Sequence, residues 1–182
     1  MTEGTISYLV GCHQFAMHPL QVIRAWRAEY GTWPKWWQTI SIICHDIGVC
    51  GRQYLSDDNA KIGHWKLGAR MACRIVRAVA RLRKDKYLAN FYAKLAWYTC
   101  AGHCPEESGF PESRLSRADK RSWLVAPMWW MWSNYYVEWH GRNIGVTPPP
   151  EWRRLVAENL QRERPLGNHQ LYLRNRKAYR CA

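Results

Sequence analysis

A histidine and an aspartate stand next to each other in residues 44–48, where an apolar stretch ends. Neighbouring side chains on a helix point about 100° apart. Near the end of a helix, His45 and Asp46 can therefore approach one metal ion from two directions. An imidazole and a carboxylate are suitable ligands for Mn, Fe, Zn, Co or Ni. The chemistry that this pair indicates is metal binding and reaction at a bound metal ion.

Three other histidines and one aspartate stand where they can join that pair. His18 opens an amphipathic segment, His64 begins a long helical pattern, and His103 follows the glycine that ends another helical pattern. A single histidine on an apolar face is more often a core residue than a ligand, so His64 counts only if partners lie beside it. Asp119 stands in an amphipathic segment and is expected to point inward. An inward carboxylate is costly unless it is paired or bound to a metal ion.

The elements that must position these residues are helices. Apolar residues recur at helical spacing along most of the chain, and no alternating run is long enough to predict a sheet. Gly31 and Gly102 are expected helix ends, and Ser113 or Ser116 is an expected cap. We expect a loop over residues 105–111 and helices over residues 18–30, 34–43, from 56–58 to near 83, 87–101, around Asp119, and 151–161. The chain is therefore predicted to be all-α.

The long helix that carries His64 has two distinct faces. One face is expected to be apolar and to meet the core, and it holds His64, Leu67, Gly68, Met71, Ile75 and Val79. The other face holds a basic stripe, which consists of Arg70, Arg74, Arg77 and Arg81. Such a stripe is either a solvated surface or a surface that follows a phosphate backbone. The sequence leaves both interpretations open.

Length and composition limit the class of protein. The 182 residues have room for one domain with a sizeable core. A formal charge of +13 favours anionic partners such as nucleotides, nucleic acid or phosphorylated metabolites. The seven cysteines form no Cys-x-x-Cys pair, which gives no support to a zinc ribbon and favours reduced thiols. No stretch is apolar enough to cross a bilayer and no secretory signal is visible, so we expect a cytoplasmic protein, in the host cytoplasm if a phage encodes it.

The order of the histidines and aspartates resembles the HD superfamily of metal-dependent phosphohydrolases. Residues 45–48 spell the His-Asp-Ile-Gly variant of its motif, and His64 with Gly68 and Ala69 resembles the H-x-x-x-G-A element of that subgroup. Residues 18–22 resemble the start of the first HD helix, and residues 103–119 resemble the closing stretch. The resemblance covers about residues 13–130. Small bacterial HD enzymes that split dinucleoside polyphosphates are similar in layout and length.

This resemblance implies a helical bundle with a binuclear centre of divalent metal (Mn, Fe, Co or Ni) in its core. The ligands that it implies are His18, His45, Asp46 and Asp119 for one metal, and His64 and His103 for the second, with Asp46 bridging the two. His13 competes with His18, which is favoured because it opens an amphipathic helix and is better spaced from His45. The HD core is expected over residues 1–135, and a helical extension with a basic tail over residues 136–182.

The chain also departs from the subgroup. Many members place a lysine directly after the motif, where it can meet substrate phosphate, whereas this chain has Val49 there. Arg52 and Lys66 are candidate replacements, and Lys120 beside the last aspartate is another. With Asp46 between the metals, Arg52 and Lys120 are the residues that we expect to take part in catalysis. Residues 47–56 contain no acidic residue, which disfavours the mononuclear deoxynucleotidase branch.

The resemblance predicts that the protein hydrolyses a phosphoric ester or anhydride in a nucleotide-type substrate with metal-activated water. One alternative is the group of HD proteins that oxidise C–H bonds at a mixed-valent di-iron site, although these usually have a longer gap before the last aspartate. Another is a nuclease or a protein that binds single-stranded nucleic acid. The basic stripe, residues 174–180 and several of the 12 tryptophans would serve that binding. No membrane partner is expected.

Overall fold

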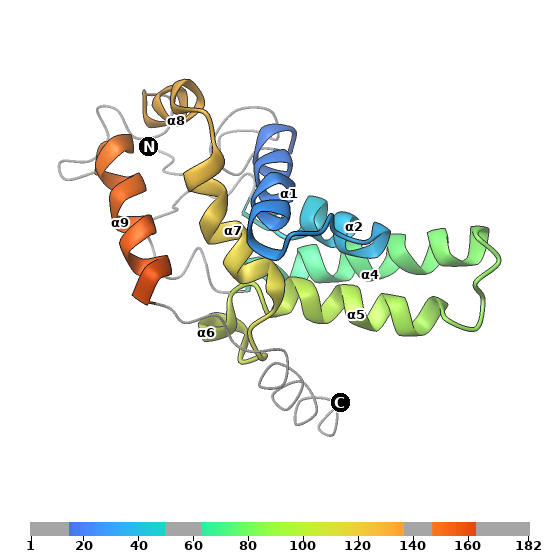
Figure 1. Cartoon of the computed structure of the whole chain (residues 1–182). Coiled ribbons are helices and arrows are strands. Elements are labelled where there is room, and N and C mark those ends of the chain that lie inside the picture. The colour runs from blue at the N-terminus through green and yellow to red at the C-terminus, as the bar shows by residue number, and fades with distance from the viewer. Residues whose placement is uncertain (1–14, 50–62, 137–146, 163–182) are drawn as a thin grey trace.

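The computed structural model describes residues 15–49, 63–136 and 147–162, and every regular element in these ranges is a helix. The helices are α1 (Met17–Tyr30), α2 (Trp36–Cys44), α4 (His64–Leu82), α5 (Ala89–Ala101), α6 (Pro105–Ser108), α7 (Arg114–Val125), α8 (Met128–Asn134) and α9 (Pro149–Arg162). Figure 1 shows α4 and α5 side by side as an antiparallel pair, with α1 packed on α7 near the base of that pair. The predicted all-α class is confirmed for the described residues.

The ends of the helices follow from local chemistry. Gly31 ends α1 with a φ of 69°, which glycine adopts at little cost, and its N–H donates to the carbonyl of Arg27. Gly102 ends α5, as predicted. Ser113 stands at the cap position of α7, but its hydroxyl donates to the carbonyl of Thr99 and so ties α7 to α5. The expected start of the long helix at residues 56–58 lies outside the described residues.

The buried face of α4 differs from the prediction. Leu67 and Ile75, which were expected in the core, are 46% and 40% exposed. The face that meets the core consists of His64, Trp65, Gly68, Ala69, Ala72, Val76 and Ala80. It packs against α5, whose own buried residues include Ala89, Ala93, Ala96 and Cys100. Small side chains on both helices allow their backbones to approach closely. The prediction chose the larger apolar residues for the core face and therefore missed this close packing.

The segment expected to be a loop also contains a helix. Residues 105–108 form the single turn α6. Pro105 stands in its first turn, where a backbone N–H would have no helical acceptor, so proline loses no hydrogen bond there. Glu106 and Glu107 follow, and acidic residues suit the positive end of a helix. The proline and glutamates that were taken as loop composition are therefore a helix start.

A charged contact fixes α1 against α7. The carboxylate of Glu29 on α1 accepts hydrogen bonds from Arg117 and Arg121 on α7. Burial alone raises the pKa of Glu29, but the two guanidinium groups bring it below its usual value. Beside this contact, Val22 and Leu115 belong to one buried apolar cluster. The pairing of α1 with α7 is therefore set by both charge and packing.

The C-terminal helices of the described region pack on α7. The guanidinium of Arg117 donates to the carbonyl of Leu160 on α9, and that of Arg153 on α9 donates to the carbonyl of Ala126. In α8, Trp130 is buried in a cluster with Ala126, whereas its neighbour Trp129 is exposed. The tryptophans of α8 thus serve both the core and the surface. The expected boundary of the HD core near residue 135 stays a prediction. None of the described helices has the length and apolar character that crossing a membrane requires.

Candidate metal centre

Four side chains from three parts of the fold bring their ligand atoms to one point. His18 lies in the first turn of α1, His45 and Asp46 follow α2, and Asp119 lies on α7. The Nε2 atom of His18 lies 3.4 Å from Nε2 of His45, 3.1 Å from Oδ2 of Asp46 and 3.2 Å from Oδ1 of Asp119. Nε2 of His45 lies 3.2 Å and 3.5 Å from the same two oxygens. We call these four residues the first ligand group.

These distances fit a metal ion. A metal about 2.1 Å from each nitrogen and oxygen ligand separates neighbouring ligand atoms by about 3.0 Å in octahedral and about 3.4 Å in tetrahedral geometry. Two imidazole nitrogens and two carboxylate oxygens are also a suitable set for a divalent transition metal. The residues of the first ligand group therefore fit a metal ion in both geometry and chemistry.

Asp46 connects the first group to a second one. Its Oδ2 atom faces His18 and His45, whereas its Oδ1 atom lies 3.4 Å from Nε2 of His103 and 3.9 Å from Nε2 of His64. The Nε2 atoms of His64 and His103 are themselves 3.2 Å apart. The two oxygens of one carboxylate thus face two clusters of nitrogen atoms. The six residues that the sequence analysis named as ligands lie together.

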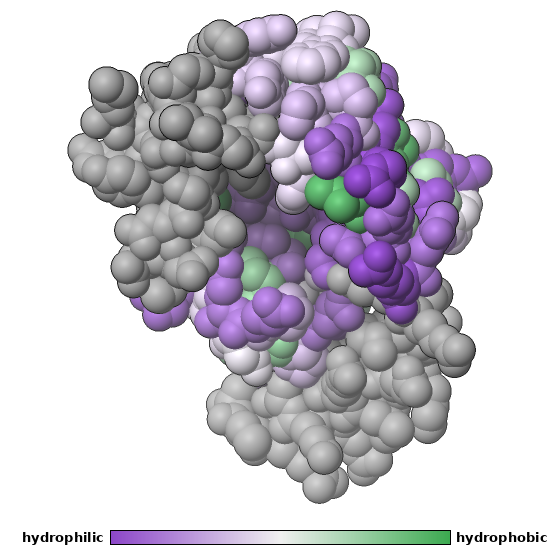
Figure 2. Space-filling model, turned by 90° about the vertical axis from the view of Figure 1, so that its left-hand side faces the viewer, coloured by the Kyte–Doolittle hydropathy of each residue, from purple (hydrophilic) through white to green (hydrophobic). Residues whose placement is uncertain are grey.

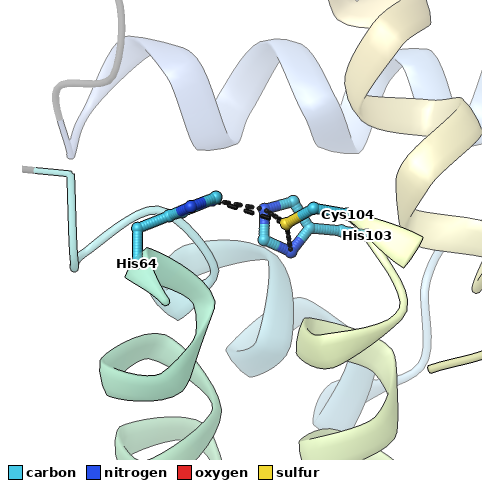
Figure 3. A group of neighbouring side chains, drawn as sticks. All are labelled: His64, His103 and Cys104. Carbon is cyan, nitrogen blue, oxygen red and sulfur yellow. Dashed lines mark hydrogen bonds between the residues drawn. The ribbon is translucent and has the colours of Figure 1, made fainter. Parts of the chain in front are cut away.

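Cys104 completes the second cluster, a role that was not predicted from the sequence. Its Sγ atom lies 3.5 Å from Nε2 of His64 and 3.1 Å from Nε2 of His103. Figure 3 shows the thiol and both imidazoles pointing toward one another, with His64 on α4 and the other two residues in the turn after α5. We call His64, His103 and Cys104 the second ligand group. The one available signal was that Cys104 directly follows a predicted ligand.

Hydrogen bonds orient the imidazole rings. Nδ1 of His45 donates to the carbonyl of Ile42 at 2.7 Å, and Nδ1 of His103 donates to the carbonyl of Cys100 at 2.5 Å. Because Nδ1 carries the hydrogen, the lone pair of each ring is on Nε2, the atom that faces the centre. Nδ1 of His64 lies 3.1 Å from a carboxylate oxygen of Glu107 on α6. These partners could not be identified from sequence.

Two glycines bring the ligand segments together. A Cβ atom on Gly68 of α4 would overlap the carbonyl oxygens of Cys44 and His45. A Cβ atom on Gly48 would overlap the carbonyl of His64. The start of α4 and the turn after α2 therefore touch backbone to backbone, which only glycine allows at these positions. This contact holds His64 next to the His45–Asp46 pair.

The electrostatics of the first group favour a cation at its centre. Burial alone lowers the pKa of His18, but hydrogen bonds and charge from Asp119 and Asp46 bring it above its ordinary value, and the pKa of His45 is also raised. Burial alone raises the pKa of Asp119, but the same two imidazoles hold it well below its usual range. The carboxylate of Asp119 thus stays ionised, and its charge favours protonated imidazoles or a metal ion beside it.

The residues proposed to meet phosphate are less well placed. Lys120 follows Asp119 but is exposed, about 100° further around α7. Lys66 is exposed on the first turn of α4, where its ammonium lies over the ring of Trp65. Arg52 lies outside the described residues, as does His13, the competitor of His18. The structure therefore does not place any of these cations within the two ligand groups.

Glu107 offers a test of the contacts that orient the ligand rings through their Nδ1 atoms. We expect Glu107→Ala to weaken metal binding about 10- to 100-fold, the usual effect of losing a partner that orients a ligand, because the ring of His64 loses the carboxylate on Nδ1. Competition with a coloured chelator measures the affinity. The matched control is Glu106→Ala, which removes the same charge from the exposed neighbour on α6. Equal affinity in the two variants would contradict the role of Glu107.

Comparison with known proteins identifies no relative of this chain. No family model, no curated protein and no solved structure matches it.

Proposed function

We propose that this protein is a metal-dependent phosphohydrolase or phosphodiesterase of the HD superfamily that acts on a nucleotide-type substrate. The observation that carries the proposal is the placement of Asp46, whose two oxygens face the two ligand groups. A carboxylate in that position is suited to bridging two divalent metal ions. The adjacent His45 and Asp46 give the superfamily its name, and the remaining ligands implied by the resemblance lie beside them.

Each side chain has a definite task in this proposal. His18, His45 and Asp119 would hold one metal, the second ligand group would hold the other, and Asp46 would contact both. Bound metal ions would lower the pKa of a water molecule and neutralise charge on the phosphoryl group. The protein contributes fixed positions, because the rings of His45 and His103 are oriented by backbone carbonyls. A site assembled in this way spends little energy on reorganisation during the reaction.

Exposure supports one direction of substrate entry. The side chain of Asp119 is 24% exposed and that of Glu107 is 25% exposed, whereas those of His18, His45 and Asp46 are almost fully buried. The substrate would therefore reach the centre from the side of α6 and α7. Lys120 on the outer surface of α7 and Arg52 remain candidate contacts for phosphate. The formal charge of +13 suits an anionic substrate. The part of the surface coloured in Figure 2 is mainly hydrophilic and hollowed near its centre.

A product assay tests the proposal. Metal-free protein is loaded separately with Mn²⁺, Co²⁺, Fe²⁺ or Zn²⁺ and offered mononucleotides, nucleoside triphosphates, cyclic and dinucleotides, and short single strands. Products are identified by mass. We expect cleavage of one class of phosphoric ester or anhydride, and none in Asp46→Ala. Absence of cleavage across all four metals and all substrates, in protein shown to contain metal, would overturn the proposal.

The same preparations separate the alternatives. A di-iron oxygenase would retain iron through purification and give a spectrum that responds to oxygen, without releasing phosphate. A nucleic-acid-binding protein would bind single strands with an affinity that falls steeply with salt. Within the basic stripe, Arg70, Arg74 and Arg81 are exposed, and Arg77 donates to the side chain of Asn90 on α5. Replacing the three exposed arginines should leave small-nucleotide turnover nearly unchanged.

A further inference from the structure

The second ligand group differs from the first in containing sulfur. Cys104 stands at the position before α6, and its thiol turns back toward the ring of His103 and across to His64 on α4. A metal about 2.3 Å from sulfur and about 2.1 Å from nitrogen separates those atoms by about 3.1–3.6 Å. The observed separations of 3.1 Å and 3.5 Å lie within that range. The sulfur also lies 3.3 Å from Nδ1 of His103, so it contacts that ring and stands close enough to both Nε2 atoms to join them at one metal ion.

The other described cysteines are placed differently. Cys44 and Cys100 are buried thiols of the α2–α4–α5 core, and the Sγ atom of Cys100 donates to the carbonyl of Ser41. Cys73 lies on α4, where its sulfur accepts a hydrogen bond from Arg77. Among the described cysteines, Cys104 alone belongs to a group of ligand atoms that converge on one point. A general need for small apolar side chains explains the two core thiols but not this one.

We propose that Cys104 is a metal ligand, and that with His64, His103 and Oδ1 of Asp46 it forms a position selective for Zn²⁺. This inference rests on the metal centre of the proposed function and extends it. Sulfur, two imidazole nitrogens and one oxygen are a four-ligand set typical of tetrahedral zinc. The first ligand group offers nitrogen and oxygen only, which suits a harder metal such as Mn²⁺ or Fe²⁺. The two positions therefore prefer different metals.

Binding at this position releases one proton. A cysteine thiol that binds no metal carries its proton at neutral pH. A coordinating thiol is deprotonated by the metal. The sulfur–hydrogen bond breaks, the sulfur–metal bond forms, and the proton passes to solvent. No oxidant or reductant is required.

Cobalt provides a direct test, because a thiolate bound to Co²⁺ gives a charge-transfer band in the near ultraviolet that nitrogen and oxygen ligands do not give. Metal-free protein is titrated with Co²⁺ under reducing conditions, and Zn²⁺ is then added to displace it. We expect the band in the wild-type protein and its loss in Cys104→Ser. We also expect the affinity for the more tightly held Zn²⁺ to fall about 100-fold or more in this variant, beyond the effect of losing an outer partner. The control is Cys73→Ser, which should keep the band and the affinity.

A second variant guards against misfolding. Cys104→Asp offers an oxygen ligand at the same place, so it should restore part of the Zn²⁺ affinity without the charge-transfer band. Helical circular dichroism should be the same in all variants. A band that survives in Cys104→Ser, or wild-type protein that binds two Co²⁺ ions without any band, would overturn the sulfur ligand. In either case, continued cleavage of nucleotides would leave the proposed function standing, whereas protein that binds Co²⁺ with the band but cleaves no substrate would refute the function and keep the ligand.

Discussion

Replacing Asp46 with alanine is expected to empty both metal positions at once. Each oxygen of this carboxylate faces one ligand group, so its loss removes a ligand from both. It also removes negative charge that offsets the charge of two cations. We expect metal affinity at both positions and catalytic rate to fall by at least about 100-fold, more than the loss of an outer partner causes. Elemental analysis of the purified protein and the nucleotide assay measure the two effects.

The pattern across variants distinguishes a bridging carboxylate from an ordinary ligand. His18→Ala should reduce metal content at the first position only, and His103→Ala at the second only. At a metal concentration 100 times the dissociation constant, each filled position should add about 2.7 kcal/mol to the free energy of unfolding of the wild-type protein, and Asp46→Ala should gain almost none. The matched control is Asp85→Ala, in the turn beyond the far end of α4. If Asp46→Ala lost metal from one position alone, Asp46 would not connect the two.

Replacing Gly68 with alanine is expected to destabilise the whole protein. Within a helix, alanine is intrinsically better than glycine by about 1 kcal/mol, so propensity alone predicts stabilisation. The new methyl group would overlap the carbonyl oxygens of Cys44 and His45, and backbone atoms cannot move aside as a flexible side chain can. We expect a net loss of about 2 kcal/mol in the free energy of unfolding, which is the upper end of the usual cost of overpacking, about 3 kcal/mol, less the gain of about 1 kcal/mol in helix propensity. Urea denaturation measures it.

Whether Gly68→Ala lowers or raises the free energy of unfolding shows whether the backbone overlap outweighs helix propensity. Ala78→Gly, at an exposed position on the same helix, should cost about 1 kcal/mol and calibrates helix propensity in this protein. Gly68→Ala should also lower metal affinity, because α4 must move away from the turn that carries His45 and Asp46. A stabilised Gly68→Ala protein would refute the close contact between these two segments.

Much of the helical framework could be predicted from the sequence. Gly31 and Gly102 end helices as expected, because the chemistry of a helix end is local. The buried face of α4 was predicted correctly for His64 and Gly68 but not for the rest, since three of its seven buried residues are alanines that pack because α5 is also lined with alanines. That complementarity depends on two helices together and is not visible in either alone. The helix α6 was also not predicted, because its proline and glutamates suit both a loop and a helix start.

The candidate site could be predicted for its histidines and aspartates but not for their surroundings. The order and spacing of the histidines and aspartates follow the motif described above, and the structure brings all six of these residues together. Cys104 and Glu107 follow no such pattern. Whether they reach the centre depends on how the chain turns between α5 and α6, which is a matter of three-dimensional packing. The backbone carbonyls that orient His45 and His103 are equally invisible, because every residue has a carbonyl.

The location of Asp119 on α7 imposes an order on the assembly of the two ligand groups during synthesis. A chain emerging from the ribosome has produced every member of the second ligand group, and Asp46, once Cys104 has been synthesised. The first ligand group remains open until α7 has been made and has docked on α1, a closure between distant segments that is slow compared with local helix pairing. A metal ion captured during synthesis would therefore meet the second ligand group first, and the first ligand group would be completed only when α7 docks on α1.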